Sequence, residues 1–188
     1  MNAIVVTDKN WAIGRNNTLL FSLPTDMRRF RSLTLDGTVI LGRKTLDSFP
    51  GGKPLPRRRN IVLTRNPGFS RPDIEIAYHP EEVRELVKDI PPEQVWLIGG
   101  SEIYRMFLPD CARAYITKVN TAASNPDAFF PNLDQDPDWA ITHSSPTICE
   151  NGLHFRFVIY ENQRFLRSRR SNSSKLRIYT SQKPCNSG

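Results

Sequence analysis

A single carboxylate, Asp26, has the neighbours expected of a residue that does chemistry. It follows Pro24 in the first turn of an expected helix, and it lies beside Met27 and four residues before Phe30. Burial beside apolar side chains raises the pKa of a carboxyl group and makes it a usable acid. An acid in a first turn can equally serve to stabilise the helix dipole. The local sequence favours this second interpretation, so the choice depends on the rest of the chain.

Two junctions that contain glycine could bind a phosphate group. They read Leu41-Gly42-Arg43-Lys44-Thr45 and Ile98-Gly99-Gly100-Ser101, and each follows an apolar run. Glycine allows a ligand to approach the backbone, and the helix start that follows offers free N–H groups to an anion. Arg43, Lys44 and Arg65 would add positive charge. Tight strand-to-helix turns explain such glycines about as often, and the chain has neither a G-x-G-x-x-G nor a G-x-x-x-x-G-K-[ST] motif.

The elements that must position these residues alternate between buried strands and amphipathic helices, which predicts an α/β fold. We expect a central, mostly parallel, twisted sheet flanked by helices, with an antiparallel C-terminal strand. The expected strands are 3–7, 38–41, 60–64, 74–77, 95–98, 114–117, 139–142 and 154–160, and the last two are joined through Asn151-Gly152. Three helices are expected. The first starts near Ser22, which is a possible cap, and the others cover 80–88 and 102–108. Residues 8–22 are expected to form a long polar connection of the kind that serves as a lid.

Composition indicates a globular protein of one folded domain. The chain has 188 residues, of which 38% are hydrophobic and 24% charged. We find no secretory signal and no apolar run long enough to cross a membrane. The three cysteines are far apart and show no metal-ligand spacing. We therefore expect a cytoplasmic protein without a metal site or a membrane partner.

The net charge of +7 is concentrated at the C-terminus. Residues 166–188 hold six of the 26 basic residues and none of the 19 acidic ones, so the remainder is nearly neutral. We expect a folded domain over residues 1–165 and a basic, flexible tail over 166–188. Nucleic-acid binding is therefore not expected, except weakly through the tail.

Six short motifs occur in the order and spacing of one known family. They are Ile13-Gly14, Leu23-Pro24-x-Asp26-x-x-x-Phe30, Ile40-Leu41-Gly42-Arg43-Lys44-Thr45, Leu55-Pro56, Arg58-Arg59-Asn60-Ile61-Val62-Leu63 and Ile98-Gly99-Gly100-Ser101-x-Ile103-Tyr104. The chain resembles dihydrofolate reductase from about residue 1 to residue 164, and the aspartate at position 26 resembles the bacterial branch.

The resemblance implies hydride transfer from NADPH to the pterin C=N bond of dihydrofolate, with a proton delivered to the adjacent nitrogen. It implies catalytic roles for Asp26, Phe21 and Thr117, with Thr117 hydrogen-bonded to the Asp26 carboxylate. The implied substrate-binding residues are Ile4, Val5, Met27, Phe30, Arg31, Phe49, Arg58 and Ile98. The implied cofactor-binding residues are Val6, Ile13, Gly42, Arg43, Lys44, Thr45, Leu63, Thr64, Arg65, Gly99, Gly100, Ser101 and Tyr104. Antifolate inhibitors would compete for the same site, and we expect a monomer.

Three positions depart from the family pattern. Phe21 replaces the usual tryptophan before Leu-Pro, which removes an indole N–H near the pterin. Leu20 stands where a proline is common, and Glu102 stands where a basic residue can lie near the cofactor's 2′-phosphate. Two alternatives therefore stay open. One is a pyrimidine reductase of riboflavin synthesis with the same fold, and the other is a non-catalytic protein that binds nucleic acid through its tail.

Overall fold

A computed structural model describes residues 1–165 and 167 of the protein, so the predicted tail lies, apart from Arg167, outside the described residues. The strands are β1 (Asn2–Thr7), β2 (Ala12–Arg15), β3 (Thr18–Leu19), β4 (Thr38–Gly42), β5 (Arg59–Leu63), β6 (Glu75–Ala77), β7 (Val95–Gly99), β8 (Arg113–Val119), β9 (Ala128–Phe129), β10 (Trp139–Ser144), β11 (Ile148–Glu150) and β12 (Leu153–Asn162). The helices are α1 (Pro24–Thr34), α2 (Arg43–Asp47), α3 (Pro80–Val87) and α4 (Ser101–Phe107), with short 3₁₀ turns at Pro50–Gly52, Pro92–Gln94 and Leu108–Asp110.

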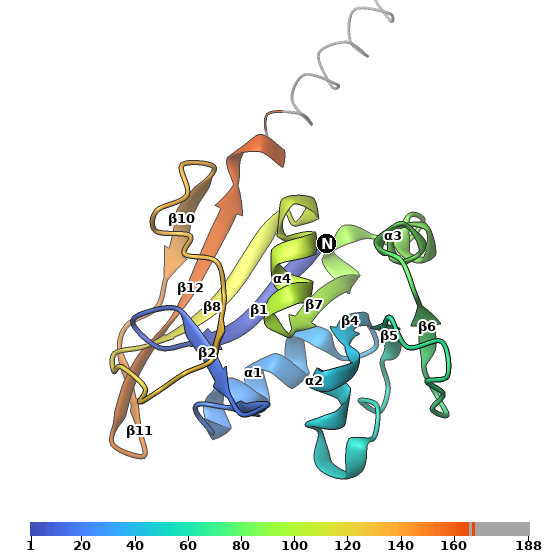
Figure 1. Ribbon diagram of the computed structural model, residues 1–188. Coiled ribbons are helices and arrows are strands. Elements are labelled where there is room, and N and C mark those ends of the chain that lie inside the picture. Colours follow the sequence, from blue (N-terminus) through green and yellow to red (C-terminus); the bar gives the residue numbers. More distant parts are fainter. Residues whose placement is uncertain (166, 168–188) are drawn as a thin grey trace, which may run out of the picture.

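A twisted sheet of nine strands forms the centre of the part that the structure describes (Figure 1). Its order is β10-β12-β8-β1-β7-β4-β5-β6, with β11 paired to β12. The pairs from β8 to β6 are parallel, whereas β12 runs antiparallel to β8 and to β10. The predicted α/β class, with a mostly parallel sheet and an antiparallel C-terminal strand, is confirmed.

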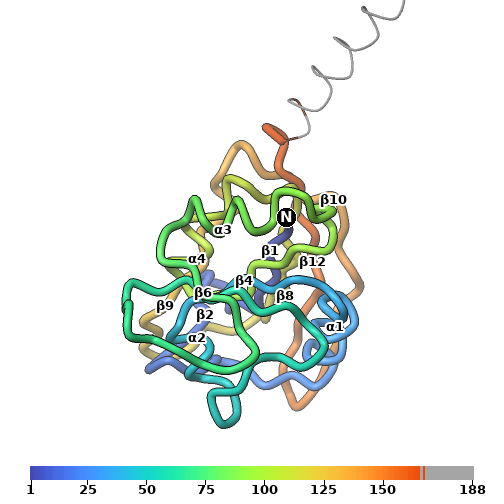
Figure 2. The backbone as a smooth tube through the Cα atoms, turned by 90° about the vertical axis from the view of Figure 1, so that its right-hand side faces the viewer, coloured from blue at the N-terminus to red at the C-terminus, as the bar shows by residue number. Residues whose placement is uncertain are grey.

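Helices cover both faces of this sheet, as the edge-on view in Figure 2 shows for α1 on one side and for α3 and α4 on the other. One buried cluster joins α3 and α4 to inward side chains such as Ala3, Ile40 and Ile61. A second cluster joins Ile4, Val39 and their neighbours to α1 and α2 on the opposite face. Parallel strands buried on both faces read as continuous apolar runs, which is why these strands were recognisable in the sequence.

The predicted polar connection over residues 8–22 contains a hairpin instead. Strands β2 and β3 pair with each other, and β2 also pairs with β9 in a separate three-stranded sheet. Asn16 and Asn17 turn the chain with φ of 52° and 58°, the backbone that a two-residue type I′ turn requires. Trp11 anchors the hairpin because its ring stacks on Phe130 at 6.0 Å.

The C-terminal hairpin also differs in detail from the prediction. Asn151 and Gly152 join β11 to β12, whereas β10 pairs with β12 from the other end of that long strand. Among the described residues, no helix is both long and apolar enough to cross a membrane.

Candidate active site

The first turn of α1 carries Asp26 against the sheet. Pro24 occupies the first helical position, where its missing N–H costs nothing, and Asp26 follows two residues later. On the neighbouring strand β8, the buried Thr117 hydroxyl donates a hydrogen bond of 2.6 Å to Asp26 Oδ1. The sequence-predicted pair of Asp26 and Thr117 is therefore brought together. Ser22 is not the helix cap, since Leu23 holds that position and provides no side-chain acceptor.

Burial raises the pKa of Asp26 above its ordinary value of 3.8. The hydrogen bond from Thr117 and the positive charge of Arg29 both lower this pKa, but desolvation of the carboxylate is the larger effect. Arg29 is itself half-buried, with its guanidinium carbon 4.3 Å from the centre of the Phe157 ring and 5.6 Å from that of Tyr115. Asp26 is thus an acid whose proton is held more tightly than in water.

Apolar side chains lie on the same face of the sheet as α1. Phe30 and Phe49 pack, half-buried, against the cluster that contains Ile4, and Ile98 joins them. Met27 is 50% exposed, so its place as a pocket wall stays a prediction. Phe21 packs instead near Leu23 in a third cluster, which also contains Val6.

Val5, Ile13 and Tyr104 lie on the opposite face, because their side chains pack in the cluster of α3 and α4. Only the backbone of Val5 can therefore face the Asp26 side of the sheet. The buried Tyr104 hydroxyl donates a hydrogen bond of 2.7 Å to the Ile4 carbonyl, which is one of the predicted substrate acceptors. A carbonyl oxygen has two lone pairs and can accept from more than one donor.

Arg58 differs from both of its arginine neighbours. Arg57 forms an ion pair with Asp36 and Arg59 with Glu75, at 2.6 Å in each case. Arg58 has no carboxylate partner in the part of the chain that the structure describes.

The Arg58 guanidinium is instead oriented by three oxygen atoms. It donates to the Thr34 hydroxyl at 3.3 Å, to the Pro56 carbonyl at 2.7 Å and to the Arg31 carbonyl at 3.4 Å. An oriented guanidinium without an anionic partner is suited to bind a carboxylate with two hydrogen bonds. Burial and the charge of Arg31 lower the pKa of Arg58, and both effects favour the arrival of an anion.

A cavity of about 1080 Å³ lies off the carboxyl ends of β4, β5 and β7. Its volume is at the upper end of ordinary ligand pockets, which suits an extended ligand. Nine predicted cofactor residues line it, namely Gly42, Arg43, Lys44, Thr45, Leu63, Thr64, Arg65, Gly100 and Ser101. The other four, Val6, Ile13, Gly99 and Tyr104, do not belong to its lining.

The two glycine junctions face each other in this cavity. A Cβ atom placed on Gly100 would lie 3.3 Å from Thr45 Oγ1, and one on Gly42 would lie 3.2 Å from Ile103 Cγ1. The Ser101 hydroxyl is buried without a hydrogen-bond partner, although buried hydroxyls are nearly always paired. Backbone N–H groups at two helix starts, a buried donor and the space left by glycine fit the pyrophosphate of a dinucleotide.

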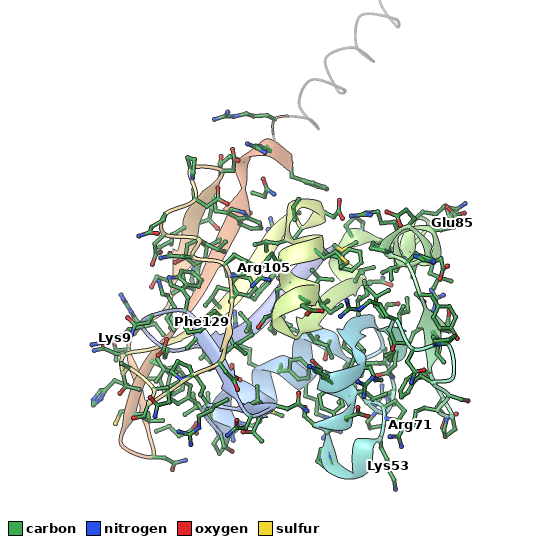
Figure 3. The ribbon with its side chains drawn as sticks, viewed as in Figure 1. Lys9, Lys53, Arg71, Glu85, Arg105 and Phe129 are labelled. Atoms are coloured by element: carbon green, nitrogen blue, oxygen red, sulfur yellow. The ribbon has the colours of Figure 1, made fainter. Side chains whose placement is uncertain are left out.

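The positive side chains of the cavity are partly neutralised. Arg43 forms an ion pair with Asp47 at 2.7 Å, and Asp47 also contacts Arg71 at 3.4 Å. Arg71 projects from the edge of the molecule (Figure 3). Arg65 lies 3.8 Å from Glu102, with both side chains largely exposed. Glu102, which departs from the family pattern, therefore lies beside Arg65, the arginine that was predicted to bind the 2′-phosphate.

Several lining residues were not predicted from the sequence. They are Asn17, Asn66, Tyr78, His79, Pro80, Ile103, Met106, Asp127 and Ala128, whereas Glu102, which also lines the cavity, was expected near the 2′-phosphate. The His79-Pro80 step follows a strand and begins α3, so it carried the same strand-to-helix signal as the two glycine junctions. Asp127 and Ala128 carried no local signal, because a distant pairing of β9 with β2 brings them to the cavity.

An open α/β sheet with a nucleotide-sized cavity at the strand ends, together with a half-buried acid of raised pKa, is typical of an enzyme that uses a dinucleotide cofactor. Comparison with known proteins identifies the family. The family model described as dihydrofolate reductase matches residues 1–162. The chain belongs to the dihydrofolate reductase family, whose members are oxidoreductases that use NADPH.

Individual relatives agree with this assignment. The chain is 36% identical to dihydrofolate reductase of Staphylococcus haemolyticus over 166 residues, which cover 87% of this chain and 96% of that protein. It is also 36% identical to dihydrofolate reductase type 3 of Salmonella typhimurium, over 87% of this chain and 99% of that protein. A solved dihydrofolate reductase of Enterococcus faecalis, complexed with NADP(H) and RAB-propyl, has a TM-score of 0.76 and 29% identity. That match covers 86% of this chain and 95% of the other.

Proposed function

We propose that the protein reduces 7,8-dihydrofolate to 5,6,7,8-tetrahydrofolate with NADPH as the hydride donor. The observation that carries this proposal is the half-buried Asp26 carboxyl group of α1, which accepts a hydrogen bond of 2.6 Å from Thr117 on the sheet whose strand ends form the cofactor cavity. When NADPH is bound, it supplies a hydride to the pterin C=N bond. The protein must then orient the pterin, exclude water and deliver one proton.

Asp26 orients the pterin ring and assists the delivery of the proton. Its carboxyl group binds the pterin amino group and ring N–H, and it promotes protonation of the nitrogen next to the reduced carbon through a water molecule. The raised pKa of Asp26 keeps a larger fraction of the acid form near neutral pH than an exposed aspartate would have. Thr117 fixes the carboxylate plane, and the carbonyls of Ile4 and Ile98 accept hydrogen bonds from the pterin.

Arg58 and the apolar wall bind the rest of the substrate. The Arg58 guanidinium pairs with a carboxylate of the glutamate tail, with Arg31 nearby on α1. Phe30 and Phe49 enclose the middle of the substrate on the α1 face. Phe21 supplies apolar surface without an N–H donor, so water near the pterin must find other partners.

The cavity residues bind NADPH in the same proposal. Thr45, Gly100 and Ser101 address the pyrophosphate, while Arg43 and Arg65 address the 2′-phosphate. The arrangement favours folate chemistry over a pyrimidine reductase, because Asp26 and Arg58, which has no carboxylate partner among residues 1–165, match the two ends of a folate. We also propose a cytoplasmic site of action, since the exposed Cys149 is a free thiol.

The test is the consumption of NADPH by the purified full-length protein after addition of dihydrofolate. We expect one NADPH oxidised per tetrahydrofolate formed, and no oxidation with the pyrimidine substrate of riboflavin synthesis. Absence of turnover with dihydrofolate would overturn the proposal.

A further inference from the structure

Glu150 lies directly over the start of the helix that carries Asp26. Its Oε2 atom accepts a hydrogen bond of 3.1 Å from the backbone N–H of Thr25, and its Oε1 atom accepts one of 2.7 Å from the Thr25 hydroxyl. Thr25 immediately precedes Asp26, while Glu150 ends β11, 125 residues further along the chain. In Figure 1 the β11–β12 hairpin and the first turn of α1 lie at the same, lower end of the molecule.

This contact replaces a helix cap that α1 does not have. The first N–H groups of a helix need an acceptor from outside the helical ladder, and a side chain at the cap position usually supplies it. Leu23 occupies that position in α1, and its side chain cannot accept a hydrogen bond. Glu150 supplies the acceptor from another element, and its negative charge is favourable at the positive end of the helix dipole.

A residue of α1 also stabilises the contact between Thr25 and Glu150. Arg28 Nη2 donates a hydrogen bond of 2.8 Å to the Thr25 hydroxyl, which in turn donates to Glu150. This chain of donors fixes the Thr25 side chain in one orientation. The position of the residue that follows, Asp26, is therefore determined by groups on α1, β8 and β11 together.

We propose that Glu150 is a positioning residue for Asp26, which holds the first turn of α1 against the sheet through its two hydrogen bonds to Thr25. The role of Glu150 in holding the first turn of α1 follows from these hydrogen bonds alone. The effect of Glu150 on the turnover of dihydrofolate rests on the proposed function.

The charges around Asp26 act in opposite directions. Arg29 on α1 and the Thr117 hydroxyl on β8 favour the ionised carboxylate, whereas Glu150 on β11 disfavours it. Tyr104 on α4 is neutral, because burial and the charge of Asp26 raise its pKa. Removal of the Glu150 charge therefore lowers the pKa of Asp26.

Two substitutions separate the charge of Glu150 from its hydrogen bonds. Glu150→Gln removes the charge and keeps an oxygen acceptor for the Thr25 N–H, whereas Glu150→Ala removes both. The control is Glu161→Gln on β12, which removes a carboxylate paired with Arg113 at 2.8 Å and leaves α1 untouched. Titration of the Asp26 carboxyl carbon by ¹³C NMR, assigned with Asp26→Asn, reports the charge effect without turnover. Hydrogen exchange of the Thr25 amide reports the cap.

We expect the Asp26 titration to move to lower pH in both Glu150 variants and to stay in place in Glu161→Gln. The Thr25 amide should exchange roughly fivefold faster in Glu150→Ala, the factor that loss of a typical cap produces, and much less so in Glu150→Gln. The pH profile of dihydrofolate turnover should move in the same direction as the titration.

An Asp26 titration that is unchanged in Glu150→Gln would overturn the charge role. Unchanged Thr25 exchange in Glu150→Ala would overturn the positioning role. If the Glu150 variants show the expected NMR changes but the wild-type protein does not reduce dihydrofolate, the proposed function is refuted and the assignment of Glu150 is supported.

Discussion

Replacement of Thr117 by valine tests the electrostatic description of Asp26. Valine keeps almost the whole shape of the threonine side chain and removes the hydroxyl that donates to Asp26 Oδ1 at 2.6 Å. Because this hydrogen bond lowers the pKa of Asp26, its loss raises that pKa further. A hydrogen bond to a buried charged group contributes about 1.5–3 kcal/mol, so Thr117→Val should lower the free energy of unfolding by about that amount where Asp26 is ionised.

The pH dependence identifies the cause of this loss. A raised folded-state pKa means that stability declines as pH rises from 3.8, the ordinary value, through the folded pKa of Asp26. In Thr117→Val this decline continues to higher pH. The difference from the wild type should therefore be small in acid, where the carboxyl group is protonated in both proteins, and reach its plateau at alkaline pH.

The assay is denaturant unfolding over a series of pH values. Thr7→Val is the matched control, since Thr7 is buried on the neighbouring strand β1 and its hydroxyl has no partner. That control should be neutral or stabilising at every pH. A Thr117→Val effect that is the same in acid and in alkali would refute the reasoning.

Three further predictions concern the site. Asp26→Asn should raise the melting temperature relative to the wild type, by an amount that grows as pH rises through the folded pKa of Asp26; a constant difference would contradict the burial effect. Arg58→Ala should raise KM for dihydrofolate by ten- to a hundredfold with little change in kcat, and Arg58→Lys should restore only part of the loss. A substrate analogue without the glutamate tail should be insensitive to both changes. Glu102→Gln should lower KM for NADPH by up to about fivefold by freeing Arg65, while KM for NADH, which lacks the 2′-phosphate, stays the same.

The sequence was sufficient for the inner strands β1, β4, β5 and β7 of the central sheet because they are buried on both faces. Residues 39–41 and 95–98 are unbroken apolar runs, and they lie in the adjacent strands β4 and β7. The small sheet was missed because β2 has four residues and β3 only two, too few to show a pattern. Asn16-Asn17 was the available signal, since asparagine tolerates the positive φ of a hairpin turn.

The site was predictable where function depends on local motifs. Gly42 and Gly100 were found because a strand that ends in glycine before a helix is visible in a few residues. Arg58 was identified only by resemblance, because its neighbours are arginines too and differ from it only in having carboxylate partners. Glu150 had no local signal, because its contact with Thr25 joins positions 125 residues apart.

The most direct test of the account is the rate of hydride transfer in a single turnover with NADPH and dihydrofolate, measured against pH for the wild type and Asp26→Asn. The wild-type rate should fall as pH rises above the folded pKa of Asp26, because the acid form is lost. The Asp26→Asn rate should be low and should not depend on the titration of this group. An Asp26→Asn protein that transfers hydride at the wild-type rate at neutral pH would contradict the assignment of Asp26 as the acid of this site.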